Sequence, residues 1–98
     1  MSKQQMIKRE YHWRRSRLQL LGELLIACQQ PRIQQDILII VHLCTKEFND
    51  IIPYAIQNDL LEATFPGGPI VYKSTVKGHV FVSQYWGIKK ILEVPHAN

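Results

Sequence analysis

The sequence has few of the residues and patterns that mark a metal site, a nucleotide site or a catalytic centre. Only two of its 98 residues are cysteines, Cys28 and Cys44, and they form no CxxC pair. The four histidines are scattered, so we predict no zinc site and expect both thiols to be buried and reduced. No glycine-rich loop precedes a lysine, and no serine, histidine and acid stand at motif spacing. We therefore expect no metal, no cofactor and no enzymatic activity.

Long apolar runs are also missing. The longest unbroken aliphatic run is Ile37–Val41, whereas a membrane-spanning helix needs about 20 residues. The first residues, Met1–Gln5, have no apolar signal core behind them. These absences predict a cytoplasmic protein that does not enter a membrane, and 98 residues suit a single domain.

Positive charge is present, but it is unevenly distributed. Residues 1–17 hold six basic side chains against one acidic one, a net charge of +5, while residues 18–98 hold six against seven, a net charge of −1. The pattern predicts a basic N-terminal arm or helix extension over residues 1–13 and a near-neutral domain over residues 14–94. Such an arm favours a polyanion as partner, although a merely solubilising tail stays open as an alternative.

The spacing of apolar residues predicts three helices, at about Arg14–Gln29, Ile33–His42 and Thr45–Asn58. The β-branched run within the second would also suit a buried strand, but apolar positions at i, i+4, i+7 and i+8 favour a helix. The third helix should begin with Cys44 or Thr45 as N-cap and bury Phe48, Ile52, Ala55 and Ile56. Pro53 should kink this helix or divide it in two.

Two short strands, 60–65 and 70–74, should follow as a hairpin around the turn Pro66-Gly67-Gly68-Pro69. A last helix should start after Thr75 as N-cap and end before Pro95, with an apolar stripe of Val80, Phe81, Tyr85, Ile88 and Leu92. The predicted fold class is α+β, a winged helix-turn-helix with a three-helix core, a two-stranded wing hairpin and a C-terminal helix.

Three segments sharpen this prediction. They are Arg15-Ser16-Arg17-Leu18 at the start of the first helix, Ile56-Gln57-Asn58-Asp59-Leu60-Leu61-Glu62, and Tyr72-Lys73-Ser74-Thr75-Val76-Lys77-Gly78. The second resembles the pattern L-x-x-N-G-L-L-E and the third Y-x-x-T-x-K-G of a family of small archaeal winged-helix DNA-binding regulators. The chain departs from this family in having Asp59 for the usual glycine, Pro53 in the recognition helix and a short last helix.

The resemblance implies that the protein binds double-stranded DNA and regulates transcription. The third helix would enter the major groove, helped by the basic N-terminal region and the base of the wing. The candidate contacts are Arg14, Arg15, Arg17, Thr45, Lys46, Asn49, Tyr54, Lys73 and Lys77. Because Glu47 and Asp50 would repel phosphates, an ordinary solvated helix surface stays open as an alternative for the third helix, as do plain surface lysines for the wing base.

The last helix has more apolar residues than one buried side requires, and Gly87 interrupts it. Family members dimerise in some cases through this helix, so we expect a homodimer with an interface of Val82, Tyr85, Trp86, Ile88 and Leu92. In the alternative, Trp86 covers the core of a monomer. A different function also stays open, that of a winged helix that binds another protein and not DNA.

Overall fold

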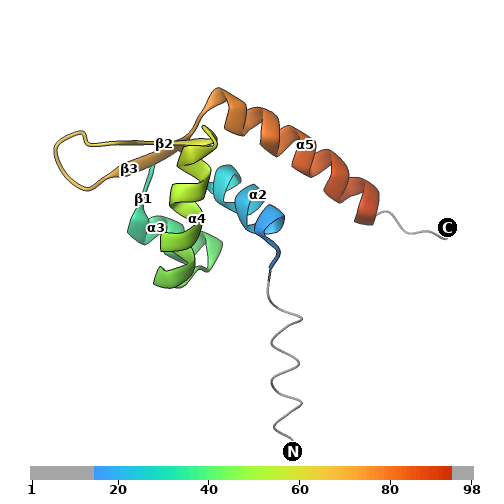
Figure 1. The fold of residues 1–98 in the computed structure, drawn as a ribbon, viewed down its shortest axis with the longest axis horizontal. Helices are drawn as coiled ribbons and strands as arrows, with labels where there is room; N and C mark the ends of the chain where they lie inside the picture. The colour runs from blue at the N-terminus through green and yellow to red at the C-terminus, as the bar shows by residue number, and fades with distance from the viewer. Residues whose placement is uncertain (1–14, 94–98) are drawn as a thin grey trace, which may run out of the picture.

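The structure is a computed structural model of the chain and describes residues 15–93. It is an α+β winged helix-turn-helix, as the sequence predicts (Figure 1). In chain order the elements are α2 (Arg17–Ala27), β1 (Arg32–Ile33), α3 (Gln34–Val41), α4 (Thr45–Gln57), β2 (Leu61–Thr64), β3 (Val71–Ser74) and α5 (Val76–Glu93). None of the described helices is both long enough and apolar enough to cross a membrane.

The first helix is shorter than predicted because Ser16 caps it. The Ser16 hydroxyl accepts a hydrogen bond from the Gln19 backbone N–H at 3.1 Å, so α2 begins at Arg17. The predicted start at Arg14 lies outside the described residues. Leu24, Leu25 and Cys28 are completely buried and form the centre of the core, whereas Leu18 is half exposed.

The sheet has three strands, not the two of the predicted hairpin. The additional strand, β1, holds Arg32 and Ile33, which pair antiparallel with Tyr72 and Val71 of β3. The strand order is β1-β3-β2, so β3 lies in the middle. Two residues are too few to show a strand periodicity, and for this reason the predicted second helix begins at Ile33, which the structure places in β1.

The second and third helices are confirmed as successive helices that meet at a sharp bend. His42 ends α3 with a left-handed φ of 60°, and α4 begins three residues later. Some buried positions of these helices differ from the prediction. Ile40 and Ile56 are partly exposed, whereas Ile51 is buried. α4 continues through Pro53 as one helix, so the predicted division in two does not occur.

The wing and the last helix are held to the core by β3. The Ser74 hydroxyl donates to the Leu25 carbonyl at 2.7 Å, and its backbone N–H donates to the Cys28 carbonyl at 2.8 Å. Thr75 caps α5 as predicted, accepting from the Gly78 N–H at 3.0 Å and donating to the Asp59 carbonyl at 2.6 Å. A Cβ on Gly78 would lie 2.3 Å from the Leu60 carbonyl oxygen, which explains the glycine of the Y-x-x-T-x-K-G segment.

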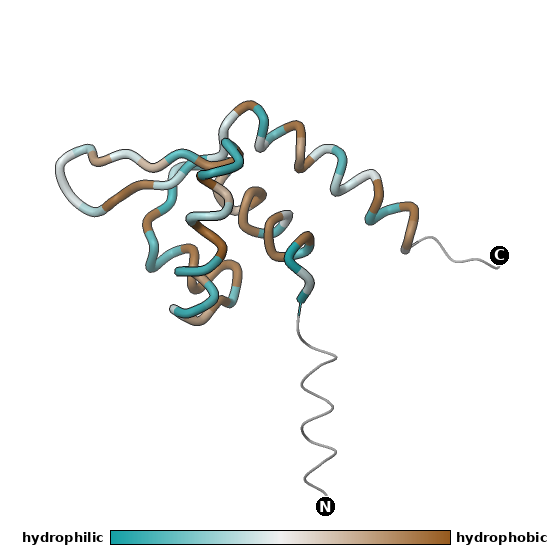
Figure 2. Tube along the Cα trace, viewed as in Figure 1, coloured by the Kyte–Doolittle hydropathy of each residue, from teal (hydrophilic) through white to brown (hydrophobic). Residues whose placement is uncertain are grey.

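The buried side of α5 differs from the predicted stripe. Val82 and Tyr85 are buried, and Tyr85 lies against Gly22 of α2, while Val80, Ile88 and Leu92 are largely exposed. Apolar and polar residues alternate along the whole of α5, which runs away from the body (Figure 2). The helix therefore uses one narrow side for the core and leaves apolar residues on the rest of its surface.

Candidate nucleic-acid interface

The outer surface of α4 is exposed and polar along its length. A capping box starts the helix, since the Glu47 N–H donates to Cys44 Sγ at 3.5 Å and Glu47 Oε1 accepts from the Cys44 N–H at 3.0 Å. Phe48, Ile51, Ile52 and Ala55 are buried. The predicted outward residues are all exposed: Thr45, Lys46, Asn49, Asp50, Pro53, Tyr54 and Gln57. This surface matches what groove insertion needs sterically.

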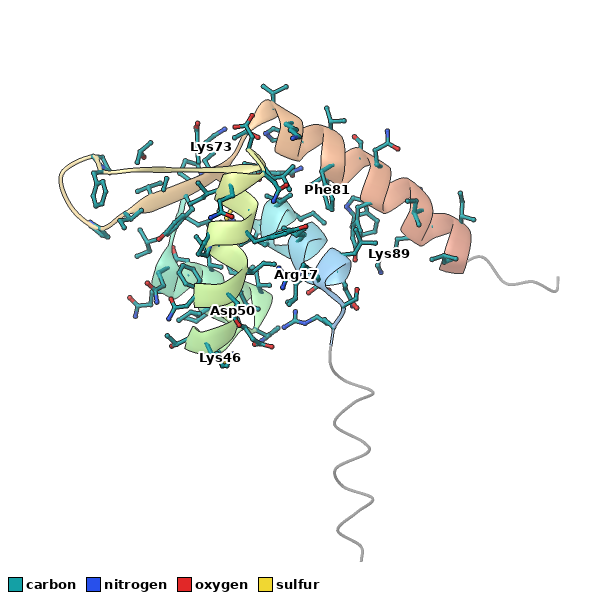
Figure 3. The ribbon with its side chains drawn as sticks, in the orientation of Figure 1. Arg17, Lys46, Asp50, Lys73, Phe81 and Lys89 are labelled. Atoms are coloured by element: carbon teal, nitrogen blue, oxygen red, sulfur yellow. The ribbon has the colours of Figure 1, made fainter. Side chains whose placement is uncertain are left out.

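The charge on this surface is nearly balanced. Lys46 Nζ lies 3.2 Å from Asp50 Oδ2, one turn along the helix, and both side chains are well exposed. Figure 3 shows the pair at the N-terminal end of α4. An exposed pair of this kind contributes little to stability, but it offsets the charge that Lys46 would offer a phosphate. Thr45 and Asn49 remain as uncharged hydrogen-bonding groups beside it.

Arg17 and Tyr54, far apart in the sequence, meet between α2 and α4. The guanidinium carbon of Arg17 lies 4.6 Å from the centre of the Tyr54 ring, a cation–π contact. Arg17 is exposed and lies beside α4 in Figure 3. The contact holds the positive charge of Arg17 next to the outer surface of α4. The charges of Lys46 and Asp50 offset each other, so Arg17 supplies positive charge beyond that pair.

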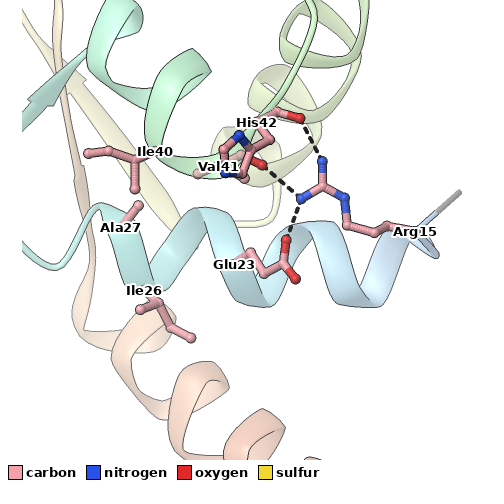
Figure 4. Close-up of a pocket in the computed structure, with 7 residues that line it drawn as sticks. All are labelled: Arg15, Glu23, Ile26, Ala27, Ile40, Val41 and His42. Atoms are coloured by element: carbon pink, nitrogen blue, oxygen red, sulfur yellow. Dashed lines mark hydrogen bonds and ion pairs between the residues drawn. The ribbon is translucent and has the colours of Figure 1, made fainter. Parts of the chain in front are cut away.

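Arg15 has a different position from that expected of a DNA contact. Its guanidinium pairs with Glu23 and donates to the carbonyls of Val41 and His42, at 2.8 Å each (Figure 4). These bonds join the start of α2 to the end of α3 along the edge of a hollow of about 390 Å³. Arg15 therefore serves mainly as an internal link, and its charge is largely committed within the chain. Arg14 lies outside the described residues.

The base of the wing offers two lysines in different settings. Lys73 of β3 is half-buried and stands directly opposite Glu62 of β2 in the ladder. Lys77 is exposed in the first turn of α5. The acid beside Lys73 weakens its positive potential, so Lys77 is the stronger candidate for a phosphate contact.

The tip of the wing is apolar. β2 and β3 stop pairing at Thr64 and Val71, which leaves six residues, 65–70, outside the ladder. Phe65 is 73% exposed there. The sequence predicts Phe65 as the end of a strand and assigns it no role in binding. The sequence feature that sets this tip apart is the absence of any charged residue from Ala63 to Tyr72.

The expected dimer interface is divided by the packing of α5. Val82 and Tyr85 are buried within the chain, 5% and 8% exposed, so a second chain would not reach them. Trp86, Ile88 and Leu92 are exposed, and so is Ile91, which the prediction did not include. A hollow of about 280 Å³ lies between α2 and α5 beside this surface, lined by Leu18, Ile88 and Leu92 among others.

The cysteines also differ from each other. Cys28 is buried, and burial raises the pKa of its thiol to about 12 against a smaller opposing effect of Arg32. Cys44 is exposed, so the prediction of two buried thiols is wrong for Cys44. Its side chain serves as the N-cap of α4, a position that lies at the helix terminus and therefore at the surface. Within residues 15–93, no three His, Cys, Asp or Glu side chains are placed to hold a metal ion.

Comparison with solved structures finds a similar fold. The crystal structure of Sso10a-2, a DNA-binding protein from Sulfolobus solfataricus, superimposes with a TM-score of 0.75 over 81% of this chain and 83% of that one. The two sequences are 14% identical, so the likeness shows a shared fold. No protein-family model matches the sequence, and no curated relative matches it either.

Proposed function

We propose that this protein binds double-stranded DNA as a homodimer and regulates transcription. In this proposal it is a cytoplasmic protein associated with the nucleoid. The observation behind the proposal is the exposed polar surface of α4, within a fold shared with a DNA-binding protein of Sulfolobus solfataricus. In this proposal α4 lies in the major groove, with Thr45, Lys46 and Asn49 nearest the bases. No enzymatic step is part of the proposed role.

The positive charge in the proposal comes from three parts of the chain. Arg17 stands beside Tyr54, Lys77 stands at the wing base, and the basic side chains of residues 1–14 precede α2 in the sequence. Phosphate contacts from these groups would give affinity without sequence preference, while α4 would supply the base contacts. Each phosphate neutralised steepens the salt dependence of binding by about 0.9 in a log–log plot.

A fluorescence anisotropy titration of a labelled duplex at about 50 mM and 200 mM salt tests the proposal. We expect binding that weakens steeply with salt and that Lys46→Ala reduces further. Removal of residues 1–13 should lower the salt slope if the basic arm contacts phosphates. The absence of any binding at the lower salt concentration would reject DNA as the partner.

Asp50→Asn makes the test specific to α4. The substitution frees Lys46 and removes a carboxylate that faces the phosphates, so DNA affinity should rise about fivefold, corresponding to about 1 kcal/mol for one exposed charge pair. Asp59→Asn is the matched control, because it removes the same charge at the other end of α4. Equal gains from both variants would indicate a general charge effect with no role for the N-terminal end of α4.

The second candidate function is that of a winged helix that binds another protein. The Lys46–Asp50 pair favours it, because a helix that reads DNA gains from uncompensated positive charge. The exposed Ile39 and Ile40 favour it as well, since they leave apolar surface on α3. The titration above separates the two functions, because only the DNA reading requires a salt-dependent complex with a bare duplex.

The homodimer is part of the same proposal and rests on α5. Four apolar side chains of α5 are exposed to water and not buried in the core of the chain: Trp86, Ile88, Ile91 and Leu92. Leu18 of α2, 50% exposed, extends this surface across the hollow between α2 and α5. A two-fold arrangement would bury these residues against their copies and set two α4 helices at a fixed spacing along the duplex.

A further inference from the structure

The wing ends in an exposed aromatic side chain. Phe65 is the first residue after the last pair of the ladder, Thr64 opposite Val71, and it is the most exposed aromatic side chain among residues 15–93. The hairpin projects away from the helices on the side opposite the C-terminal end of α5 (Figure 1). Phe65 therefore stands at the outer part of a protruding element.

The residues around Phe65 make the tip thin and uncharged. Pro66, Gly67, Gly68 and Pro69 follow it, and no charged residue occurs from Ala63 to Tyr72. Gly67 has a φ of 116°, which favours glycine, and a Cβ at either glycine would meet no atom within 4 Å. Such a tip offers phosphates no compensating charge, but its narrow backbone lets it enter a groove closely.

The base of the wing is fixed to the helix proposed to read DNA. The ring of Tyr72 in β3 packs edge-on against that of Phe48 in α4, with 5.7 Å between their centres. Both rings are buried, and Ser74 ties the same strand to α2 through two hydrogen bonds. The base of the wing is therefore held against α4, and we expect that docking α4 in one groove also brings Phe65 close to the same duplex.

We propose that Phe65 inserts between two adjacent base pairs from the minor groove and bends the duplex. This inference rests on the proposed function, since it requires α4 to be bound to DNA. Apolar side chains such as Phe act as wedges of this kind, partly unstacking a base step and kinking the duplex by about 20–90°. The proposal adds DNA bending to DNA binding and assigns it to a residue outside α4.

The proposal also predicts which DNA the wing prefers. Unstacking is least costly at pyrimidine–purine steps such as TA and most costly in stiff A-tracts. The wild-type protein should therefore bind a duplex with a TA step under the wing more tightly than one with an A-tract there. This preference would arise without any hydrogen bond from the tip to a base edge.

The test measures binding and bending separately on the same duplex. Anisotropy gives the affinity, energy transfer between dyes at the two ends gives the bend, and 2-aminopurine beside the TA step reports unstacking. The proteins are the full-length wild type, Phe65→Ala, Phe65→Leu and the control Ile39→Ala, which truncates a similarly exposed apolar side chain of α3. Because Phe65 and Ile39 are both exposed, thermal melting should show all four equally folded.

We expect the wild type and Ile39→Ala to bend the duplex and to raise 2-aminopurine fluorescence. Phe65→Ala should lose both signals and the preference for TA, while still binding the A-tract duplex within about threefold of the wild type, since the phosphate contacts remain. Phe65→Leu should keep part of the bend, because leucine also acts as a wedge.

Several results would overturn the inference in distinguishable ways. Binding without a bend, or a bend that persists in Phe65→Ala, would remove the wedge and leave the proposed DNA binding intact. No binding of the wild type to any duplex would remove both. If Phe65→Ala instead changed only the self-association of the protein, the tip would be a protein contact and the wedge would again be excluded.

Discussion

Asp59 holds a backbone conformation that suits glycine. Its φ is 61°, and it follows the C-cap of α4 at the position where the similar pattern L-x-x-N-G-L-L-E has glycine. Asn58, the C-cap itself, has a φ of −94°, so the left-handed residue is the one that follows the cap. The side chain of Asp59 also places a negative charge at the negative end of the helix dipole.

We therefore expect Asp59→Gly to stabilise the chain by about 1 kcal/mol, since it relieves a left-handed conformation and removes the charge. Asp59→Asn should stabilise it less, because asparagine keeps a Cβ. The free energy of unfolding from urea denaturation measures both. The bond from the Thr75 hydroxyl ends on the Asp59 backbone carbonyl, so neither variant removes it. A loss of stability in Asp59→Gly would contradict this account.

The buried thiol of Cys28 makes stability depend on pH in the alkaline range. Burial raises its pKa from 9.0 to about 12, so between these values the folded chain keeps a proton that the unfolded chain has lost. The free energy of unfolding should thus fall as pH rises above about 9. Burial also raises the pKa of Tyr72, which acts in the same direction.

Urea denaturation at pH 7 and at higher pH values measures this slope. Cys28→Ala should flatten the dependence on pH, although it lowers stability at neutral pH by leaving a space in the core. Cys44→Ser is the control, because it replaces the chain's other thiol at an exposed position. A slope unchanged in Cys28→Ala would assign the pH dependence to Tyr72 or to other groups.

Helices α2 and α5 contact each other through a glycine. A Cβ on Gly22 would lie 2.6–2.8 Å from carbon atoms of the Tyr85 ring, so the ring occupies the space that a side chain would need. Gly87, on the same α5, has no atom within 4 Å of its Cβ position. The two glycines therefore differ in what they do for one chain, the first allowing close packing and the second only weakening a helix.

Gly22→Ala should lower the free energy of unfolding by about 1–2 kcal/mol, because the clash with Tyr85 outweighs the gain in helix propensity. Gly87→Ala should raise it by about 1 kcal/mol, since only the propensity changes. Thermal or urea denaturation of the two variants beside the wild type checks both signs. A Gly22→Ala protein as stable as the wild type would mean that α5 does not pack on α2 as described.

At the scale of the whole molecule, half of the twelve large apolar side chains that are exposed among the described residues lie on α5. The proposed dimer through Trp86, Ile88, Ile91 and Leu92 predicts twice the chain mass of 11.5 kDa in sedimentation equilibrium. Leu92→Asp should shift the protein to the monomer, because two buried, unpaired charges would face each other. Its folding should be unaffected, since Leu92 is 74% exposed.

Ile39→Asp serves as the control for the dimer, because Ile39 is similarly exposed but lies on α3. Gly87→Ala adds a second measurement in the same instrument. If two α5 helices approach closely at Gly87, the alanine will weaken the dimer even though it stabilises each chain. A wild-type protein that stays monomeric at high concentration would end the dimer proposal and leave the exposed surface of α5 for another partner.

The order of helices, hairpin and last helix follows from local chemistry in the sequence. Apolar spacing marks α2, α3 and α4, the glycines and prolines at 66–69 mark the turn of the wing, and Thr75 marks the start of α5. Each of these signals is local, because it depends only on residues that lie close together in the sequence. They predicted the winged-helix fold and the outward residues of α4 without knowledge of any long-range contact.

The remaining features depend on partners far away in the chain. The two-residue strand β1 exists only because β3 pairs with it. The guanidinium of Arg15 is engaged within the chain because it pairs with Glu23 and donates to the carbonyls of Val41 and His42. Which side of α5 is buried depends on the fit of Tyr85 against Gly22, since apolar residues occur all around that helix. Periodicity describes one segment at a time, so it leaves open which of several apolar sides meets the core, and packing between elements chooses among them.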